Sequence, residues 1–400
     1  MAKFRLAAAV LLAVSICTLC GCVVYTDLAD RAIVQSIGID YLPDKKVYRI
    51  SMQYFNQTSE GGINQIDKTQ DNVLKSVGEG ENIFAAAKNA SVLTGKDMLL
   101  SENKLIIIGK ELLSYDLGAT LEFFTGNLHS HPQSYVAAAE NTAEELLDIR
   151  FKEGPTSSQR LAGLLKNAAS EGKGKFSYPY EVMTMLCSKT RSAYLPLLKT
   201  ATLKTDITIP KDSGGEGGKS GGSGGEEQSE EGETTIITDG GVIFCGGRAQ
   251  ATVDTDVSSV IQFLTDGTDE YSLSVMLSEY DDPSVTLTGM TRSINASVQG
   301  GKAVFDISLN ASGKVVFKGT LKPYQSKVYK EVEKACEAKL RDMIENAVAK
   351  VKDGYGCDVF GFENALRRDC NGFYNDNADN MKEIIKTAGY NVRVEVDVRQ

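Results

Sequence analysis

The 400-residue sequence contains no tryptophan and only two histidines. Without tryptophan, carbohydrate stacking on an indole ring is excluded. With so little histidine, general acid–base catalysis would have to rest on carboxylates. Acidic residues outnumber basic ones by 53 to 43, which gives a formal net charge of −10 and excludes nucleic acid as a natural partner.

The residues that remain as candidates for catalysis do not form a recognisable site. His129 and His131 precede Pro132 without a carboxylate or cysteine set at metal-ligand spacing, so we interpret them as a solvated loop. The pairs Glu144–Glu145 and Asp281–Asp282 hold adjacent side chains, which point in different directions in regular structure and indicate a solvated helix start and a turn. We therefore predict no catalytic, cofactor-binding or metal site, and no enzymatic activity.

The sequence has eight cysteines, of which Cys17, Cys20 and Cys22 belong to its first segment. The other five are Cys187, Cys245, Cys336, Cys357 and Cys370. An odd number argues against a disulfide framework and favours scattered thiols, some of them buried. Cys357 and Cys370 could pair if the fold makes them neighbours, and the sequence leaves that alternative open.

The first segment has the pattern of a bacterial lipoprotein signal. Lys3 and Arg5 are followed by an apolar stretch over 6–19 and by the box Leu19-Cys20-Gly21-Cys22. The stretch is too short for a typical membrane-spanning helix. We predict cleavage before Cys22 and attachment of diacylglycerol and acyl chains to its thiol, the protein's only expected modification, which would anchor it to a membrane. An ordinary cleaved signal or an uncleaved membrane anchor are the alternatives.

Glycine, serine and glutamate replace all hydrophobic periodicity over 211–233, which predicts a flexible linker or an inserted loop. We accordingly divide the chain into a signal peptide over 1–21, an N-terminal α+β region over 22–210 with two subdomains, this linker, and a C-terminal α+β domain over 234–400. The Gly221–Gly225 match to G-x-S-x-G lies within the linker and lacks the strand and helix of a nucleophile elbow.

Hydrophobic periodicity predicts the elements on either side of the linker. In the N-terminal region, we predict strands at 33–40, 47–55, 105–108, 134–139 and 195–209, and helices at 82–94, 111–124, from 142, 155–169 and 180–188. In the C-terminal region, we predict strands at 234–244, 271–280, 285–298, 303–317 and 392–398, and helices at 257–264, 326–352, up to 366 and 381–388. Several strands that follow one another along the chain, together with one long amphipathic helix, indicate a multi-domain α+β fold with mixed or antiparallel sheets.

Three stretches of the sequence resemble the Ger(x)C family, the C-subunit lipoproteins of nutrient germinant receptors in endospore-forming bacteria. The first is Cys22 with the stretch Asp27–Asp40, which ends in Ile37-Gly38-Ile39-Asp40. The second runs from Gly80–Asn89 to Asn103–Leu112, and the third is the long helix followed by Asp358–Phe362 and the closing strand. The chain departs from the family pattern at Val23-Val24, where Trp-Asp is common.

This resemblance implies three α+β domains and a non-enzymatic subunit on the outer face of the inner spore membrane. It also implies two integral-membrane partners, the A and B subunits, in a receptor for small nutrients. The rival hypothesis is an independent solute-binding lipoprotein that delivers a ligand to a membrane transporter, and an envelope enzyme is a third. The sequence leaves open whether this chain itself binds a small molecule.

Overall fold

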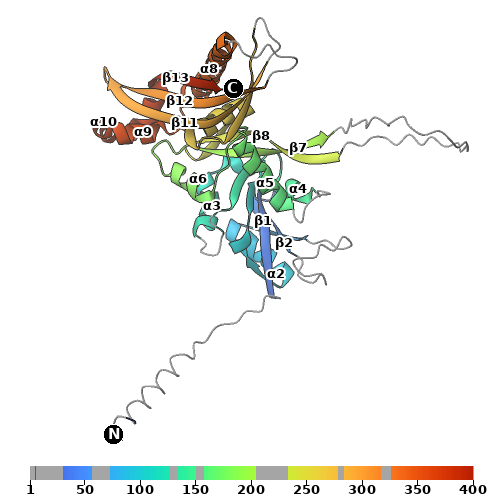
Figure 1. The fold of residues 1–400 in the computed structure, drawn as a ribbon. Helices are drawn as coiled ribbons and strands as arrows, with labels where there is room; N and C mark the ends of the chain where they lie inside the picture. The colour runs from blue at the N-terminus through green and yellow to red at the C-terminus, as the bar shows by residue number, and fades with distance from the viewer. Residues whose placement is uncertain are drawn as a thin grey trace, which may run out of the picture.

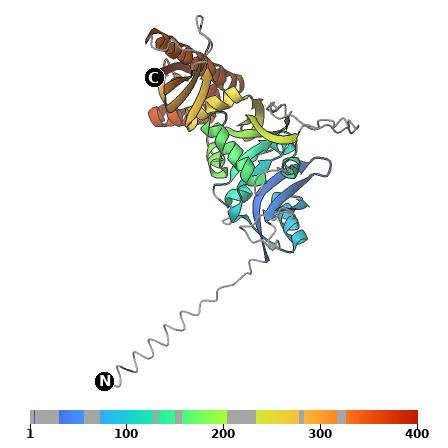
Figure 2. The ribbon, with the colours of Figure 1, turned by 45° about the vertical axis from the view of Figure 1, so that its right-hand side comes forward.

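The computed structural model describes residue 5 and residues 30–55, 73–126, 131, 133–149, 157–203, 233–277, 283–316 and 326–399. Within these ranges the strands form two sheets, one of nine strands and one of four. Figure 2 shows that the four-stranded sheet and its helices lie at the opposite end of the molecule from the first strands. The predicted α+β class is therefore confirmed.

The large sheet is parallel at its centre and antiparallel at its edges. Its strands are β1 (Arg31–Leu42), β2 (Val47–Phe55), β3 (Val73–Gly80), β4 (Asp97–Leu99), β5 (Leu105–Ile108), β6 (Tyr135–Ala139), β7 (Ala193–Leu203), β8 (Glu233–Cys245) and β9 (Arg248–Val253). The spatial order is β3-β2-β1-β5-β6-β7-β8-β9, with β4 paired to the start of β1. β1, β5, β6 and β7 run parallel, and the remaining neighbours on this path pair antiparallel.

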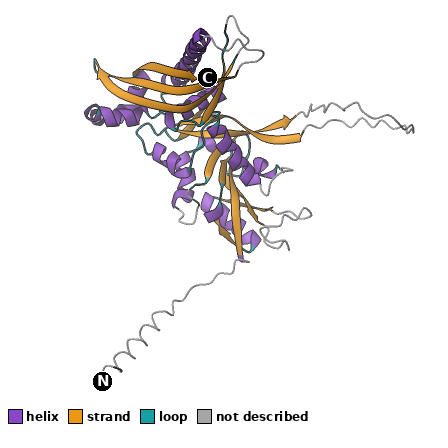
Figure 3. Ribbon diagram, viewed as in Figure 1, coloured by secondary structure: helices purple, strands orange, loops and turns teal. Residues whose placement is uncertain are grey.

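Helices cover both faces of this sheet, as Figures 1 and 3 show. One face packs against α2 (Ile83–Thr94), α3 (Leu117–Gly126) and α6 (Pro179–Leu186), and the other against α4 (Ala143–Asp148) and α5 (Ser157–Ser170). In β5, Ile106 and Ile108 belong to the first core and Leu105 and Ile107 to the second. Because both faces are buried, β5 is a continuous apolar run without polar alternation.

The large sheet includes strands from both sides of the predicted linker. β7 and β8 pair antiparallel from Ala193–Phe244 to Leu203–Glu233, so β8 and the following β9 extend the N-terminal sheet. The linker itself lies outside the described residues. The proposed domain boundaries and the division of 22–210 into two subdomains therefore remain predictions.

The small sheet has one polar face and one face covered by helices. Its order is β10 (Glu270–Ser274), β11 (Ser284–Gln299), β12 (Lys302–Val316) and β13 (Gly389–Arg399), and only β12 and β13 run parallel. The accompanying helices are α7 (Thr255–Thr265), α8 (Ser326–Val348) with a π-helical end (Ala349–Asp353), α9 (Phe362–Asp369), α10 (Asn371–Asp376) and α11 (Met381–Thr387). None of the helices in the described ranges combines the length and apolarity needed to cross a bilayer.

The side chains of α8 complete the outer edge of the small sheet. Glu337 accepts a hydrogen bond from the backbone N–H of Val396 at 3.2 Å, and Glu333 accepts one from Val398 at 3.1 Å. These N–H groups belong to β13, whose other edge pairs with β12. The long helix predicted from its apolar stripe therefore also satisfies an exposed strand edge, which would otherwise be free to pair with another chain.

Most of the predicted elements are present, and the errors concern short or glycine-containing segments. The single helix expected over 111–124 is a 3₁₀ turn (Lys110–Ser114) followed by α3. β3, β4, β9 and α10 were not predicted. β3 was not predicted because its sequence, Val-Leu-Lys-Ser-Val-Gly-Glu-Gly, is rich in residues that disfavour strands.

The glycines of β3 have a packing role, because they let α2 lie directly on the strand. A Cβ atom at Gly78 would stand 2.2 Å from the carbonyl oxygen of Ala86, and one at Gly80 would stand 2.5 Å from the Ala86 nitrogen. Both distances are far below van der Waals contact. Gly78 and Gly80 therefore exchange strand propensity for close packing of helix on sheet.

We expect Gly78→Ala to lower the free energy of unfolding by about 1–3 kcal/mol, because the added methyl group must push the α2 backbone away from β3. Chemical denaturation of the purified chain measures the effect. Gly163→Ala in α5 is the matched control, since a Cβ atom added at this position would have no neighbour within 4 Å. It should raise stability by roughly 0.5–1 kcal/mol through helix propensity, and an equal loss in both variants would contradict the packing argument.

Candidate functional site

Several residues named from the sequence lie outside the described part of the structure. These are Cys22, His129, Pro132, the Asp281–Asp282 pair and the linker. His131 lies in the loop before β6, half-buried, and its Nδ1 accepts a hydrogen bond from the backbone N–H of Gln133 at 3.1 Å. Among the described residues, no group of three or more His, Cys, Asp or Glu side chains is arranged to hold a metal ion.

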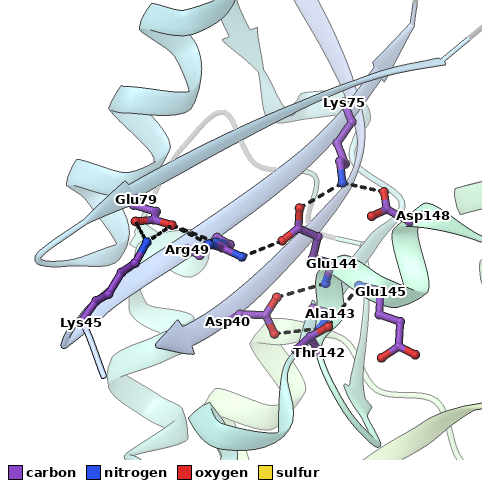
Figure 4. Close-up of polar contacts among 10 residues, drawn as sticks. All are labelled: Asp40, Lys45, Arg49, Lys75, Glu79, Thr142, Ala143, Glu144, Glu145 and Asp148. Carbon is purple, nitrogen blue, oxygen red and sulfur yellow. Dashed lines mark hydrogen bonds and ion pairs between the residues drawn. The ribbon is translucent and has the colours of Figure 1, made fainter. Parts of the chain in front are cut away.

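The Ile37-Gly38-Ile39-Asp40 motif places a buried carboxylate at the amino end of α4 (Figure 4). Asp40 Oδ1 accepts a hydrogen bond from the backbone N–H of Ala143 at 2.8 Å, and Oδ2 accepts one from Glu144 at 3.0 Å. Thr142 caps the same helix through the N–H of Glu145 at 3.2 Å. Asp40 thus accepts hydrogen bonds from helix N–H groups that Thr142 alone leaves without partners.

Two glycines make room for this contact. A Cβ at Gly109, at the end of β5, would stand 1.8 Å from Asp40 Oδ1. A Cβ at Gly38 would lie 3.0 Å from the Ala143 side chain and 3.1 Å from that of Leu147. The motifs Ile37–Asp40 and Leu105–Gly109, which carry part of the family resemblance, therefore form one packing unit around α4.

An alternating chain of ion pairs runs from this unit across β2 and β3. Arg49 donates to Glu79 at 2.6 Å and to Glu144 at 3.1 Å. Lys75 pairs with Glu144 at 3.0 Å and with Asp148 at 2.5 Å, while Lys45 pairs with Glu79 at 3.1 Å, as Figure 4 shows. The predicted helix start is confirmed and Glu145 is exposed, but Glu144 is only partly exposed, because tertiary packing brings two cations from the sheet against it.

The electrostatics of this cluster suit a structural role. Burial raises the pKa of the Asp40 carboxyl, and the N–H groups of Ala143 and Glu144 oppose the shift. The hydrogen bond to Glu79 raises the pKa of Arg49, and the same bond lowers the pKa of Glu79. A depression of about 340 Å³ lies over the cluster, but Arg49, Glu144 and Asp148 in its wall are already engaged in ion pairs. We therefore assign the cluster to fixing α4 on the sheet.

We expect Asp40→Asn to destabilise the chain by about 1–3 kcal/mol, because the amide NH₂ group faces a backbone N–H where an oxygen accepted before. The folded-state pKa of Asp40 is raised, so the folded protein binds the proton more tightly than the unfolded chain. The contribution of the carboxyl is then largest in acid and decreases as the pH rises from about 4. The stability gap between the two proteins should narrow from pH 4 to 7 in urea titrations, and a widening gap would contradict the assignment.

Two buried carboxylates, those of Asp358 and Glu363, join the two sheets. Asp358 precedes α9 and accepts N–H bonds from Gly361 and Phe362 at 2.9 Å each and from Glu363 at 2.6 Å. Burial raises the pKa of the Asp358 carboxyl, and the N–H groups of Glu363 and Phe362 oppose the shift. Its own N–H donates at 3.0 Å to the hydroxyl of Ser192, which directly precedes β7 of the large sheet.

Glu363 reaches from α9 into the N-terminal half of the molecule. Its carboxylate accepts the backbone N–H groups of Lys189 and Thr190 at 2.8 and 3.0 Å. It also accepts the Thr190 hydroxyl at 3.1 Å and the phenol of Tyr374 at 3.1 Å. Four donors around a carboxylate that is 5% exposed form a specific lock between the 189–192 segment and the C-terminal helices.

Further contacts close the junction along a second line. The Thr268 hydroxyl lies 2.7 Å from the carbonyl oxygen of Ser170, whose own hydroxyl donates to Asp269 at 2.8 Å. The buried ammonium of Lys175 pairs with Asp266. The hydrophobic core of the small sheet also continues into Tyr194 and Ile243 of the large one. The two sheets are therefore held as one packed unit.

The sequence indicated part of this junction through the Asp358–Phe362 stretch. Phe360 and Phe362 are buried, Gly361 adopts a φ of 90°, and the Phe362 ring stacks on Phe305 with centroids 4.5 Å apart. Both phenylalanines are therefore packing residues beside a bend. The roles of Asp358 and Glu363 were missed, although an acidic residue a few positions before a helix is a recognisable capping signal.

Glu363→Gln should weaken this lock by roughly 2–4 kcal/mol, because an amide in place of the carboxylate cannot accept from all four donors. We expect hydrogen exchange at the amides of Lys189 and Thr190 to speed up at least tenfold, with a lower unfolding midpoint. Glu383→Gln, at an exposed position of α11, is the control and should leave both readouts unchanged. Unchanged exchange in Glu363→Gln would refute the lock.

An open groove of about 770 Å³ lies beside α2 and α3. Phe84 and Phe123 form part of its wall, with ring centroids 6.3 Å apart, and the Phe84 side chain is largely exposed. Tyr48, Asp116 and Arg248 complete its polar margin. An aromatic surface with charges of both signs at its edge has the composition of a small-molecule or partner contact.

Comparison with known proteins identifies the class to which this architecture belongs. Residues 25–200 match the family model described as the spore germination protein N-terminal domain, and residues 239–400 match the model described as spore germination B3/GerAC-like, C-terminal. The fold is thus that of a two-part spore germination protein. The chain belongs to the Ger(x)C family, the C subunits of spore germinant receptors, which confirms the resemblance seen in the sequence.

Individual relatives agree with this assignment. Spore germination protein KC of Bacillus subtilis (strain 168) is 29% identical over 148 residues, which make up 35% of this chain and 35% of that protein. The alignment therefore spans about a third of the relative. The crystal structure of the GerBC protein superposes with a TM-score of 0.52 at 14% identity, over 91% of this chain and 97% of that one, and supports the fold.

Proposed function

We propose that this protein is the lipid-anchored, non-enzymatic C subunit of a nutrient germinant receptor, which acts in receptor assembly and signalling during spore germination. The observation that carries the proposal is the succession of both family domains, in order, directly after a lipoprotein box. The partners would be the A- and B-type integral-membrane subunits, and the location the outer face of the inner spore membrane.

The structure supports a role in positioning rather than catalysis. The charged clusters around Asp40 and Glu363 are engaged in helix capping, ion pairs and the junction between the sheets. Eight positions separate Cys22 from Asp30, where the described fold begins, and this stretch reaches at most roughly 26–29 Å. The start of β1 lies far from the four-stranded sheet (Figure 1), so a lipid on Cys22 would hold the large sheet near the membrane and the small sheet away from it.

Cys22→Ala should abolish lipid attachment and release the chain from the membrane fraction, because a single cysteine carries the proposed anchor. Fractionation followed by mass spectrometry of the amino-terminal peptide measures both effects. Cys187→Ala is the control, since this thiol is exposed and far along the chain. If the Cys22→Ala protein remained lipidated and membrane-bound, Cys22 would not be the site of lipid attachment.

The aromatic groove beside Phe84 favours a second candidate, an independent solute-binding lipoprotein. The two functions separate experimentally. Co-purification with A- and B-type membrane subunits supports the receptor subunit, whereas tight binding of nutrients to the isolated soluble chain in calorimetric titrations, without such partners, supports the solute-binding protein.

A further inference from the structure

Two buried thiols from distant parts of the chain meet at the junction between the sheets. Cys245 is the last residue of β8 in the large sheet, and Cys357 follows the π-helical end of α8 in the C-terminal half. Cys245 is 8% exposed and Cys357 is fully buried. The sequence left open a pairing of Cys357 with Cys370, but the Cys370 thiol instead donates to the carbonyl oxygen of Ala296 at 3.5 Å.

The contacts of the two sulfur atoms place them side by side. Cys245 Sγ donates to the carbonyl oxygen of Gly356 at 3.6 Å and lies 3.9 Å from that of Tyr355. Cys357 Sγ lies 3.9 Å from the same Tyr355 oxygen. Both thiols therefore contact the same carbonyl oxygen, that of Tyr355.

The surroundings make Cys245 the more reactive of the two. The hydrogen bond from Cys357 lowers the pKa of the Cys245 thiol to about 6 against the effect of burial, and the Lys382 ammonium and the Ser192 hydroxyl add to the shift. The side chain of Lys382 lies next to Gly356, and Ser192 Oγ is 4.0 Å from Cys245 Sγ. A thiolate beside a protonated thiol is the arrangement that thiol–disulfide exchange requires.

The remaining described cysteines lack this arrangement. Cys336 lies alone in the apolar stripe of α8, where burial raises the pKa of its thiol to about 11. Cys187 is exposed at the end of α6. Both therefore serve as internal comparisons for the Cys245–Cys357 pair.

We propose that Cys245 and Cys357 form a disulfide bond that links the large sheet to the C-terminal half of the molecule. The inference rests on the proposed function in one respect, since export of the chain removes it from the reducing cytosol. The oxidant is a disulfide, either of a thiol oxidoreductase or of a low-molecular-weight thiol, and it meets Cys245 late in folding, when the two thiols already lie together and the junction has not yet closed over them.

The reaction balances as two exchange steps. The Cys245 thiolate attacks one sulfur of the oxidant disulfide and forms a mixed disulfide, and the other sulfur leaves as a thiolate that takes up a proton. Cys357 then loses its proton and attacks the Cys245 sulfur, which expels the second thiolate of the oxidant. The two cysteines together lose two electrons and two protons, and the oxidant becomes two thiols.

The bond would reinforce the lock made by Glu363. Cys245 and Gly356 are 111 positions apart, and closure of such a long loop restricts the unfolded chain strongly. The cross-link would hold β8 against the segment that leads into α9, close to Ser192 and Asp358. The relative position of the two sheets would then be covalently fixed.

The test uses the full chain purified from membranes under alkylating, non-reducing conditions. Peptide mapping should find the Cys245–Cys357 cross-link and the lipid on Cys22 in the same sample. Free Cys245 and Cys357 on a lipidated chain would overturn the disulfide and leave the proposed function intact. Absence of the lipid would overturn the anchor, and the disulfide would then be decided by refolding the reduced chain with oxidised glutathione, where free thiols at both positions refute it.

Thermal unfolding with and without dithiothreitol supplies an independent readout. Reduction should lower the unfolding midpoint of the wild type and of Cys336→Ala by roughly 5–10 °C. It should leave the midpoint of Cys245→Ala unchanged, because the bond is already absent, and Cys357→Ala should behave the same way. A midpoint that does not respond to reduction in the wild type would refute the disulfide without reference to any variant.

Discussion

The carboxylate of Glu363 is the contact on which the arrangement of the two sheets depends. It accepts four hydrogen bonds, three of them from the 189–190 segment of the other half of the molecule. A buried charge is costly unless donors surround it, so this group is compatible with only one relative position of the sheets. The continuous core through Tyr194 and Ile243 then adds apolar burial to a geometry that the carboxylate specifies.

The same physical device recurs at the other helix starts. The buried carboxylates of Asp40 and Asp358 cap α4 and α9, and the exposed Asp254 caps α7 through the N–H of Val257 at 2.9 Å. Asp40 caps a helix of another element, and Gly109 leaves room for its carboxylate. Asp358 caps the helix that follows it, and Gly361 permits the bend between them. For a protein proposed to transmit a signal between membrane partners, a frame built from buried carboxylates and close packing is rigid, which suits a positioning subunit.

Much of the fold was predictable because its elements carry local patterns. The sequence patterns of β2, β11 and β12, the apolar run of β5 and the amphipathic stripe of α8 were all interpreted correctly. The failures have physical causes. β3 contains glycines because α2 packs directly on it. Glu144 was expected in solvent because its ion-pair partners, Arg49 and Lys75, lie far away along the chain.

The sequence by itself determined most of the helices and strands, the α+β class, and the family resemblance that both domain matches confirm. It also predicts the lipid attachment at Cys22. Only the tertiary structure decided that β8 and β9 join the N-terminal sheet, that Glu363 meets Lys189 and Thr190, and that Cys245 meets Cys357. The reason is that periodicity and capping signals act over a few residues. A contact between groups more than a hundred positions apart exists only after the whole chain has packed.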